Sequence, residues 1–244
     1  MKALPQLSLK DILVLFTYGV LVGSAIGIAL AMGVVGLINT LDLTALGILL
    51  GTILGIVLAI GRSYGKKPIS LFILIYEKVL RGIPLLVIFF LIYFGLPQIG
   101  INLNAITSAI LGLGLRSAAY QSQIFRGAIN SIPEGQIDAA YSLGMSKLKS
   151  IRHIILPQVL RLSIPGWSNE FTILLKDTSI AFTIGVIDLM RQARYIQVRE
   201  PNLVLVIYLL VAFVYLAFVL FANKSLGYLE KKYQMVGYKT EVHR

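Results

Sequence analysis

The sequence SIPEGQIDAAYSLGM, residues 131–145, lies between two apolar runs and predicts a short amphipathic helix. Ser131 and Glu134 have the spacing of a capping box, and Pro133 suits a first helical turn. Asp138 adds negative charge near the helix start, where the helix dipole favours it. Apolar residues then recur at helical spacing, but the stretch is too polar to cross a bilayer. We therefore expect it to lie along a membrane surface.

The composition of the whole chain indicates an integral membrane protein. Of its 244 residues, 57% are hydrophobic and 14% are charged, whereas soluble domains carry about 25% charged residues. A soluble fold of this size would lack the polar surface needed to cover it. The uncharged run that begins at Ile12 is too long for the apolar core of a cleavable signal peptide, so we expect this segment to be retained.

The basic residues are concentrated in short loops. Lys and Arg number 22 against 11 Asp and Glu, which gives a formal net charge of +11. The clustered cations are Lys2, Lys10, Arg62, Lys66, Lys67, Lys147, Lys149, Arg152, Lys224, Lys231 and Lys232. This distribution is typical of cytoplasmic loops and places residues 131–145 on the cytoplasmic side. It also favours a lipid bilayer over nucleic acid as the partner of the basic charge.

Catalytic, metal and nucleotide sites have no support in the sequence. The chain has no Cys, which excludes disulfides, thiolate metal sites and Cys nucleophiles. His153 and His243 lack metal-ligand spacing with acidic neighbours. No HExxH motif is present. Residues 61–67 have the wrong spacing for a phosphate-binding loop and lack Ser or Thr after the lysines, so we expect any ATP to bind elsewhere.

Uncharged runs predict six membrane-spanning helices with both termini in the cytoplasm. The run from Ile12 to Gly61, interrupted only by Asp42, is long enough for two crossings joined by a turn near residues 33–39. Further spans are expected at about 68–95, 104–130 and 202–223.

A sixth span is expected at residues 151–176, where charged residues weaken the apolar pattern. An irregular stretch should follow at 177–201. Arg191, Arg194 and Arg199 would then lie on the outer side, contrary to the usual charge distribution, so we expect an amphipathic segment on the outer surface there.

Two ladders of small residues have the four-residue spacing of one helix face. They are Gly19, Gly23 and Gly27, and then Gly47, Gly51, Gly55 and Ala59. Such faces allow helix backbones to approach closely. We favour tight packing within one subunit over a specific dimer interface.

Seven residues in and after the 131–145 stretch have the spacing of a known motif. Asp138-Ala139-Ala140, Gly144, Ile154, Leu156 and Pro157 resemble the EAA motif of binding-protein-dependent ABC importer permeases, with Asp where Glu is usual. The resemblance implies a coupling helix at about 133–148 that docks into a groove of an ATPase subunit. The coupling residues would be Asp138, Ala139, Ala140, Leu143, Gly144, Ile154, Leu156 and Pro157. Gly144 would leave room for the partner's side chains.

Other motifs narrow the resemblance to the polar amino-acid branch (histidine, glutamine, glutamate and arginine types). The matching segments are Asn39-Thr40-Leu41, Arg81-Gly82-Ile83-Pro84-Leu85-Leu86, Ala119-Tyr120, Ile124-Phe125-Arg126-Gly127, Pro157-Gln158, Asn169-Glu170-Phe171 and Leu175-Lys176-Asp177-Thr178-Ser179. Together they cover about residues 36–232. Gln123, where Glu is common, and Arg116, where Asn is often found, depart from the pattern.

The resemblance implies an all-α membrane protein with the type I ABC importer permease fold. Residues 36–232 would hold a five-helix core, residues 1–35 an extra N-terminal transmembrane helix, and residues 233–244 a cytoplasmic tail. The expected partners are two ATPase subunits that bind ATP and Mg²⁺, a second permease subunit (identical or paralogous), and an extracellular or periplasmic substrate-binding protein. The location would be the plasma (inner) membrane of a prokaryote.

Charged residues inside the spans suggest a substrate path. An isolated charge there costs at least ~2.5 kcal/mol, so Arg116 needs a partner or a wet cavity. It would either bind the carboxylate of a transiting amino acid or form an ion pair with Glu170 or Asp177. Glu170 would meet a substrate cation or balance Lys176. The candidate path residues are Arg116, Ser117, Tyr120, Glu170, Lys176, Asp177, Thr178 and Ser179. Arg81 is expected at a cytoplasmic helix end.

A secondary transporter driven by protons or sodium is the main alternative. Such transporters normally show internal repeats and matching broken helices. We find no convincing repeat, and a coupling helix would have no role in that mechanism.

Overall fold

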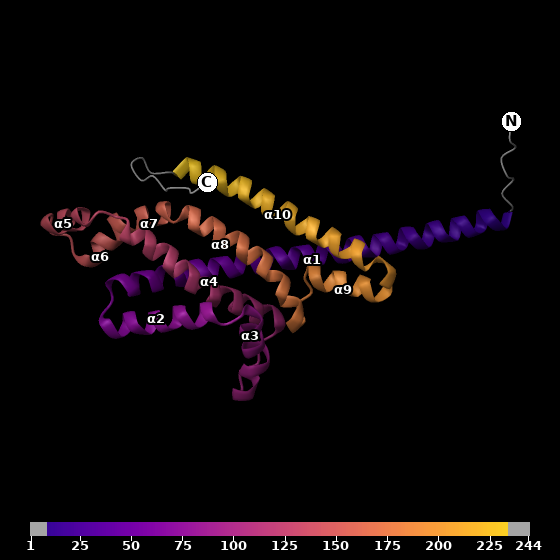
Figure 1. Ribbon diagram of the computed structural model, residues 1–244, viewed down its shortest axis with the longest axis horizontal. Helices are drawn as coiled ribbons and strands as arrows, with labels where there is room; N and C mark the ends of the chain where they lie inside the picture. Colours follow the sequence, from indigo (N-terminus) through magenta and orange to yellow (C-terminus); the bar gives the residue numbers. More distant parts are fainter. Residues whose placement is uncertain (1–8, 234–244) are drawn as a thin grey trace.

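The computed structural model describes the backbone of residues 9–233 and the side chains of residues 33–233. Within that range the chain is helical, without strands (Figure 1). The α-helices are α1 (Leu9–Tyr64), α2 (Lys67–Gly82), α3 (Leu85–Phe90), α4 (Ala105–Asn130), α5 (Glu134–Ser142), α6 (Lys147–Ser150), α7 (Leu156–Leu162), α8 (Ile164–Asp177), α9 (Leu189–Arg199) and α10 (Val204–Tyr233). Short π and 3₁₀ turns are η1 (Leu91–Gly95), η2 (Leu96–Ile99), η3 (Ile151–Ile155), η4 (Thr178–Ile184) and η5 (Pro201–Leu203).

Helix α1 is continuous, so the turn predicted near residues 33–39 is wrong. Tertiary contacts stabilise the helix there. A Cβ on Gly36 would lie 2.9 Å from the Asp188 carbonyl oxygen, and the Asn39 side-chain amide donates to the carbonyl of Ile187 (2.7 Å). Residues 33–39 therefore pack as a helix against the segment before α9. The predicted cytoplasmic position of both termini and the side chains of Gly19, Gly23 and Gly27 lie outside the described residues.

The second small-residue ladder packs against α4 of the same chain. A Cβ on Gly47 would lie 3.1 Å from Leu113 Cβ, and one on Gly51 would lie 2.8 Å from Ser117 Cβ. One on Gly55 would lie 2.8 Å from Gln121 Cβ. Since any larger side chain would push α4 away, the prediction of tight packing within one subunit is confirmed for this ladder.

Helix α2 does not continue to residue 95 as predicted. It ends at Gly82, and the chain turns by 106° before it continues as α3, η1 and η2. Ile83 is extended (φ −88°, ψ 131°) because the ring of Pro84 disfavours a helical conformation in the preceding residue. The prediction at 104–130 is confirmed: α4 begins after Asn104, whose side chain accepts a hydrogen bond from the backbone N–H of Thr107 (2.8 Å).

The region from 151 to 201 is more helical than predicted. The expected span at 151–176 consists of η3, α7 and α8, with a break around Ser163. The stretch predicted to be irregular contains η4 and α9, and Asp188 caps α9 by accepting a hydrogen bond from the backbone N–H of Arg191 (2.8 Å). Arg194 and Arg199 are exposed on α9, whereas Leu189 and Ala193 are buried. Helix α9 is thus amphipathic, as expected for a surface segment.

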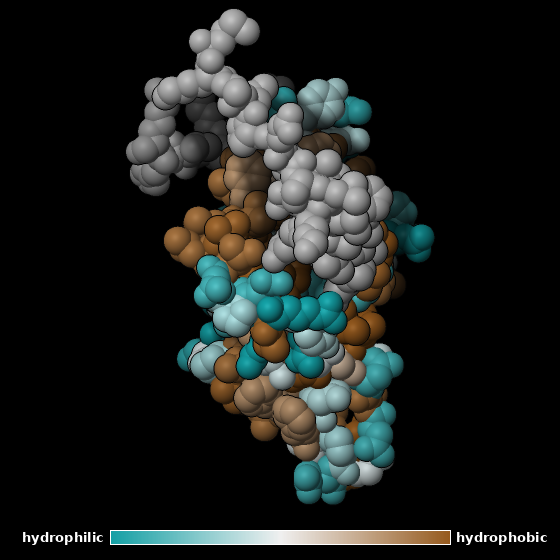
Figure 2. Space-filling model, turned by 90° about the vertical axis from the view of Figure 1, so that its right-hand side faces the viewer, coloured by the Kyte–Doolittle hydropathy of each residue, from teal (hydrophilic) through white to brown (hydrophobic). Residues whose placement is uncertain are grey.

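Two described helical segments, Gly33–Tyr64 and Pro201–Tyr233, are long and apolar enough to cross a membrane. The bent pair of Lys67–Gly82 and Leu85–Ile99 is a third if it counts as one span. In Figure 1, α5 and α6 lie at the left end of the long axis, α9 lies to the right of the centre, and the first part of α1 extends beyond α9. Figure 2 shows the α9 end, where polar residues gather in the middle and apolar residues flank them.

Candidate functional site

The tip formed by α5 and α6 is held in shape by glycine at the end of α5. Gly144 has φ +75°, a conformation that side chains rarely adopt. The backbone N–H of Met145 donates to the carbonyl of Ala140 (3.0 Å), and that of Gly144 donates to the carbonyl of Tyr141 (2.9 Å). This is the Schellman arrangement, which satisfies carbonyls that the helix end leaves free. A Cβ on Gly144 would meet nothing within 4 Å, so the space beside it is open.

The capping box predicted for α5 is wrong. Ser131 caps the end of α4 and donates to the carbonyl of Ala128 (2.8 Å), so its hydroxyl turns away from α5. Pro133 is the residue before the helix, and Glu134 is the first residue in it. The negative charge at the helix start remains as predicted.

Polar contacts tie the tip to the helices behind it. The side-chain amide of Gln158 in α7 donates to Gln136 Oε1 in α5 (2.7 Å). Lys147 Nζ donates to the carbonyl of Tyr64 at the end of α1 (2.8 Å). Ala140 is 1% exposed and Ile137 packs against a buried apolar cluster. These contacts join α5 to α7 and α6 to α1.

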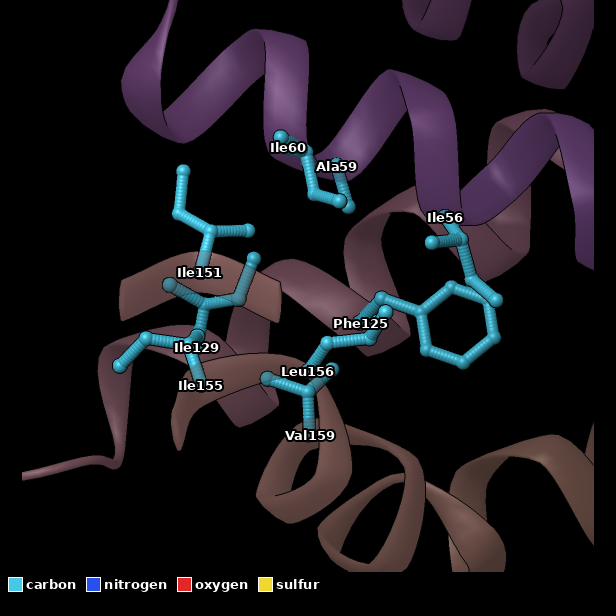
Figure 3. Close-up of a pocket in the computed structure, with 9 residues that line it drawn as sticks. All are labelled: Ile56, Ala59, Ile60, Phe125, Ile129, Ile151, Ile155, Leu156 and Val159. Carbon is cyan, nitrogen blue, oxygen red and sulfur yellow. The ribbon is translucent and has the colours of Figure 1, made fainter. Parts of the chain in front are cut away.

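The cluster behind the tip encloses a small apolar cavity of about 10 Å³ (Figure 3). Its lining residues come from three parts of the chain: Ile56, Ala59 and Ile60 from α1, Phe125 and Ile129 from α4, and Ile151, Ile155, Leu156 and Val159 from η3 and α7. A space of this size with no polar lining holds about one water at most and has no partners for it. We interpret it as a packing gap in the joint between these helices.

The front of the tip exposes apolar side chains. Leu143 is 83% exposed, Leu148 is 75% exposed, and Tyr141 is 45% exposed. We call these three residues the tip patch. Asp138, Ala139 and Pro157 are also exposed, whereas Ile154 and Leu156 are half-buried and Ala140 is buried. Some of the predicted coupling residues are thus exposed at the front of the tip, and the others pack behind them. Exposed apolar residues of this kind are common at protein interfaces.

A second polar group lies in the middle of the bundle. Arg116 in α4 forms an ion pair with Asp177 at the end of α8, and the two side chains are 20% and 22% exposed. Tyr120 lies between two cations: the guanidinium carbon of Arg116 is 5.0 Å from its ring centre and that of Arg81 is 4.8 Å away. The ion-pair alternative for Arg116 is therefore the one observed. Arg81 is not at a cytoplasmic helix end, because the break at Pro84 ends α2 halfway through the bundle.

Glu170 belongs to a buried chain of hydrogen bonds. It is 3% exposed and accepts from Ser117 Oγ (2.8 Å), which in turn accepts from Gln121 Nε2 (3.0 Å). Thr52 Oγ1 donates to Gln121 Oε1 (2.9 Å) and accepts from Trp167 Nε1 (2.8 Å). The chain joins α1, α4 and α8, and buried polar groups linked in this way hold helices in one register.

The remaining path candidates have local partners. Thr178 is buried and its hydroxyl donates to the carbonyl of Leu175 (2.7 Å). Ser179 donates to the carbonyl of Lys176 (2.6 Å), and the Lys176 side chain is exposed. The structure therefore brings Arg116, Tyr120 and Asp177 together. It places Ser117 and Glu170 in the adjoining series of hydrogen bonds and leaves Lys176 apart from both groups.

Sequence reasoning missed the buried carboxyl of Glu77, as it missed that of Asp188. Glu77 in α2 is 0% exposed and accepts from Ser122 Oγ (2.6 Å) and from Gln123 Nε2 (3.4 Å). Among the described side chains no cation pairs with it. A lone acid inside a predicted span is a signal for such a site. Gln123, at the position that departs from the family pattern, is one of its partners.

Comparison with known proteins agrees with this arrangement. Residues 51–235 match the family model described as "Binding-protein-dependent transport system inner membrane component". The chain belongs to this family. It is the permease subunit of an ABC importer of the bacterial inner membrane, its ATPase is a separate subunit that binds the nucleotide, and the family prediction is confirmed.

Individual members of the family are similar over much of the chain. It is 48% identical over 123 residues to the probable amino-acid permease protein YxeN of Bacillus subtilis, a match that covers 49% of this chain and 55% of that protein. It is 39% identical over 180 residues to the L-cystine transport system permease protein TcyB of the same bacterium (74% and 77% covered). A crystal structure of an amino acid ABC transporter with histidines has TM-score 0.76 and 36% identity, covering 85% of this chain and 97% of that one. These relatives agree with the amino-acid branch predicted above.

Proposed function

We propose that this permease subunit imports polar amino acids. The single observation that carries the proposal is the polar centre of the bundle, where Arg116 and Asp177 offer opposite charges at one place. An amino acid carries the complementary pair, a carboxylate for the guanidinium and an ammonium for the carboxylate. The names of the similar permeases, for L-cystine and for amino acids generally, support the same substrate class.

The Arg116–Asp177 ion pair would close the path when no substrate is bound. A zwitterion can replace both halves of the pair without leaving either charge unpaired, which a sugar or a simple ion cannot do. Tyr120 would hold the Arg116 guanidinium against its ring while the pair is open. Ser117 and Glu170 would form the wall behind it, and Thr178 and Ser179 its outer end. Lys176 would lie at the margin of the path.

Coupling to ATP would pass through the tip patch. In the proposed complex, two ATPase subunits grip the tips of two permease subunits, identical or paralogous, and a binding protein delivers substrate to the outer face. Closure of the ATPases would move the tips together. The contacts of Gln136 with Gln158 and of Lys147 with Tyr64 would carry the movement to α7 and α1. Alternating access then follows from the different affinities of ATP and the loaded binding protein for the two states.

The proposed organisation keeps a five-helix core at residues 36–232. Residues 1–35 would add an N-terminal transmembrane helix and residues 233–244 a cytoplasmic tail. In the structure α1 is continuous across this boundary, so two separate crossings would require a bend near residues 33–39.

The test is reconstitution of the permease with its ATPase and binding protein in vesicles. Polar amino acids are screened one at a time for stimulation of ATP hydrolysis and for uptake. We expect at least one to stimulate both. Stimulation by none would contradict the proposed substrate class. Uptake that collapses with the ion gradient and ignores ATP depletion would instead favour a secondary transporter.

A further inference from the structure

A polar cavity of about 310 Å³ lies between α8 and α10, away from the Arg116–Asp177 pair. The polar residues and glycine in its lining are Ser168, Asn169 and Thr172 of α8 and Asn223, Gly227 and Glu230 of α10. Its volume is within the range of about 300–1,000 Å³ that small-molecule sites occupy. Figure 1 shows α8 and α10 running side by side.

The cavity is formed by two polar helix faces that meet. Asn223, Gly227 and Glu230 are spaced by four and three residues, so they share one face of α10. Ser168, Asn169 and Thr172 do the same on α8. Most of α10 outside this face is apolar. Polar residues in membrane proteins typically line wet cavities or functional sites, and here both helices turn their polar faces toward one space.

One buried hydroxyl in this lining has no partner. Ser168 is 7% exposed, and its Oγ makes no hydrogen bond with the described part of the chain. An unsatisfied buried hydroxyl is unfavourable, so a molecule in the cavity would stabilise it. A Cβ on Gly227 would meet nothing within 4 Å, which shows that glycine leaves this wall of the cavity open.

The charge of the lining selects the ligand. Glu230 is the one acid among the lining residues, and none of them is Lys, Arg or His. A carboxylate binds an ammonium group, and the hydroxyl and amide donors of Ser168, Asn169 and Asn223 bind an anionic group. We propose that this cavity binds a zwitterion with an ammonium group, held by Glu230 at one end and by Ser168 and the two amides at the other.

Two sources supply such a zwitterion. The first is the transported amino acid, and this source rests on the proposed function. Ser168 precedes Asp177 by nine residues on α8, about 13 Å along the helix toward the α5 end. The cavity would then be a release site on the cytoplasmic side of the central ion pair. The second source is the headgroup of an ethanolamine phospholipid.

The absence of Cys from this chain allows an occupancy assay in the whole complex, with labelling measured on the separated permease subunit. Asn223→Cys places a single thiol in the lining, and Lys224→Cys places one on the exposed neighbouring position as the matched control. Each complex is reconstituted in nanodiscs of phosphatidylcholine and phosphatidylglycerol, and the rate of reaction with a water-soluble maleimide is measured with and without millimolar L-glutamine or L-arginine. We expect the amino acid to slow labelling of the Asn223→Cys thiol about fivefold or more, as occupancy of most sites requires, and to leave the control unchanged.

Further arms identify the source and the role of Glu230. Nanodiscs that contain phosphatidylethanolamine, without added amino acid, test the headgroup. Protection in that arm alone supports the site with lipid as its ligand. Glu230→Gln in the Asn223→Cys background should raise the ligand concentration needed for half-maximal protection about tenfold, since a charged hydrogen bond is lost. Glu200→Gln, in the connection between α9 and η5 and thirty residues before Glu230, is the charge control and should change nothing.

Several outcomes would overturn the proposal. They are a thiol that does not react at all, a thiol that neither ligand protects, protection that survives Glu230→Gln, and cross-linking of the thiol to a second copy that fills the groove. ATP hydrolysis by the same preparations is measured in parallel. Amino-acid stimulation without protection rejects the cavity and leaves the proposed function intact. Protection by the lipid without any stimulation of ATP hydrolysis supports the cavity and contradicts the proposed function.

Discussion

Substitution of Gly144 tests whether the tip patch docks on an ATPase. Gly144 has φ +75°, and its missing Cβ points into open space. A substituted side chain therefore meets no steric clash within the subunit and costs only the left-handed backbone conformation, roughly 1–2 kcal/mol for most residues and less for Asn and Asp. Gly144→Asp should consequently insert into the membrane and fold almost normally.

The effect on docking should be much larger. In the proposed complex the carboxylate of Gly144→Asp would be buried against the partner without a cation, next to the tip patch. An unpaired charge at an interface costs on the order of 2–5 kcal/mol, which weakens association at least about thirtyfold. Gly144→Asn has nearly the same shape and backbone preference, so it separates the effect of charge from that of bulk.

The assay is copurification of the ATPase with tagged permease from membranes, together with thermal unfolding of the isolated permease. We expect the Asp variant to lose most of the ATPase, the Asn variant to lose less, and both permeases to unfold within a few degrees of the wild type. Full recovery of the ATPase with the Asp variant would refute the docking role of this glycine. Loss of folding in both variants would refute the strain argument.

Three further predictions follow from packing and charge. Gly51→Val should overpack the α1–α4 contact and destabilise the protein by about 1–3 kcal/mol, measured as a lower unfolding midpoint, whereas the same change at the open position Gly33 should not. Arg116→Gln should leave Asp177 unpaired and destabilise the protein by ~3 kcal/mol. Adding Asp177→Asn should restore stability but not uptake, and unchanged apparent substrate affinity in the single variant would remove the binding role. Burial raises the pKa of Asp188 to about 7. The folded state therefore binds an extra proton between about pH 4 and 7 and loses stability as pH rises through that window. Asp188→Asn should abolish this pH dependence of the unfolding temperature, and a pH dependence that persists in the variant would contradict the prediction.

The fold could be predicted from sequence where one local rule was enough. The predicted span at 104–130 matches α4 almost to the residue, and the spacing of Gly47, Gly51 and Gly55 correctly indicated close packing inside the subunit. The motif around Asp138 was sufficient for the family. The error at residues 33–39 came from a distant contact: α1 passes through these residues because the segment before α9 packs there. The missed bend after Gly82 had a local signal in Pro84.

The site shows the same division. Charges inside spans marked Arg116, Glu170 and Asp177 as candidates, but the list could not say which charge meets which. Only the fold shows that Arg116 pairs with Asp177 while Glu170 accepts from Ser117. The cavity between α8 and α10 was not predicted, because its two polar faces lie about fifty residues apart in sequence and neither is unusual alone.

For this protein, the sequence by itself determined the membrane environment, the helical class and the family, and it predicts a cytoplasmic position for the tip. Those properties depend on composition, on the length of apolar runs and on short-range motifs, all of which can be recognised in the sequence without knowing which residues are in contact. The partners of buried charges, the continuity of α1 through residues 33–39 and the polar cavity were decided only by tertiary structure. Each depends on which helix faces meet, and contact between faces distant in sequence is a property of the packed bundle and not of any single segment.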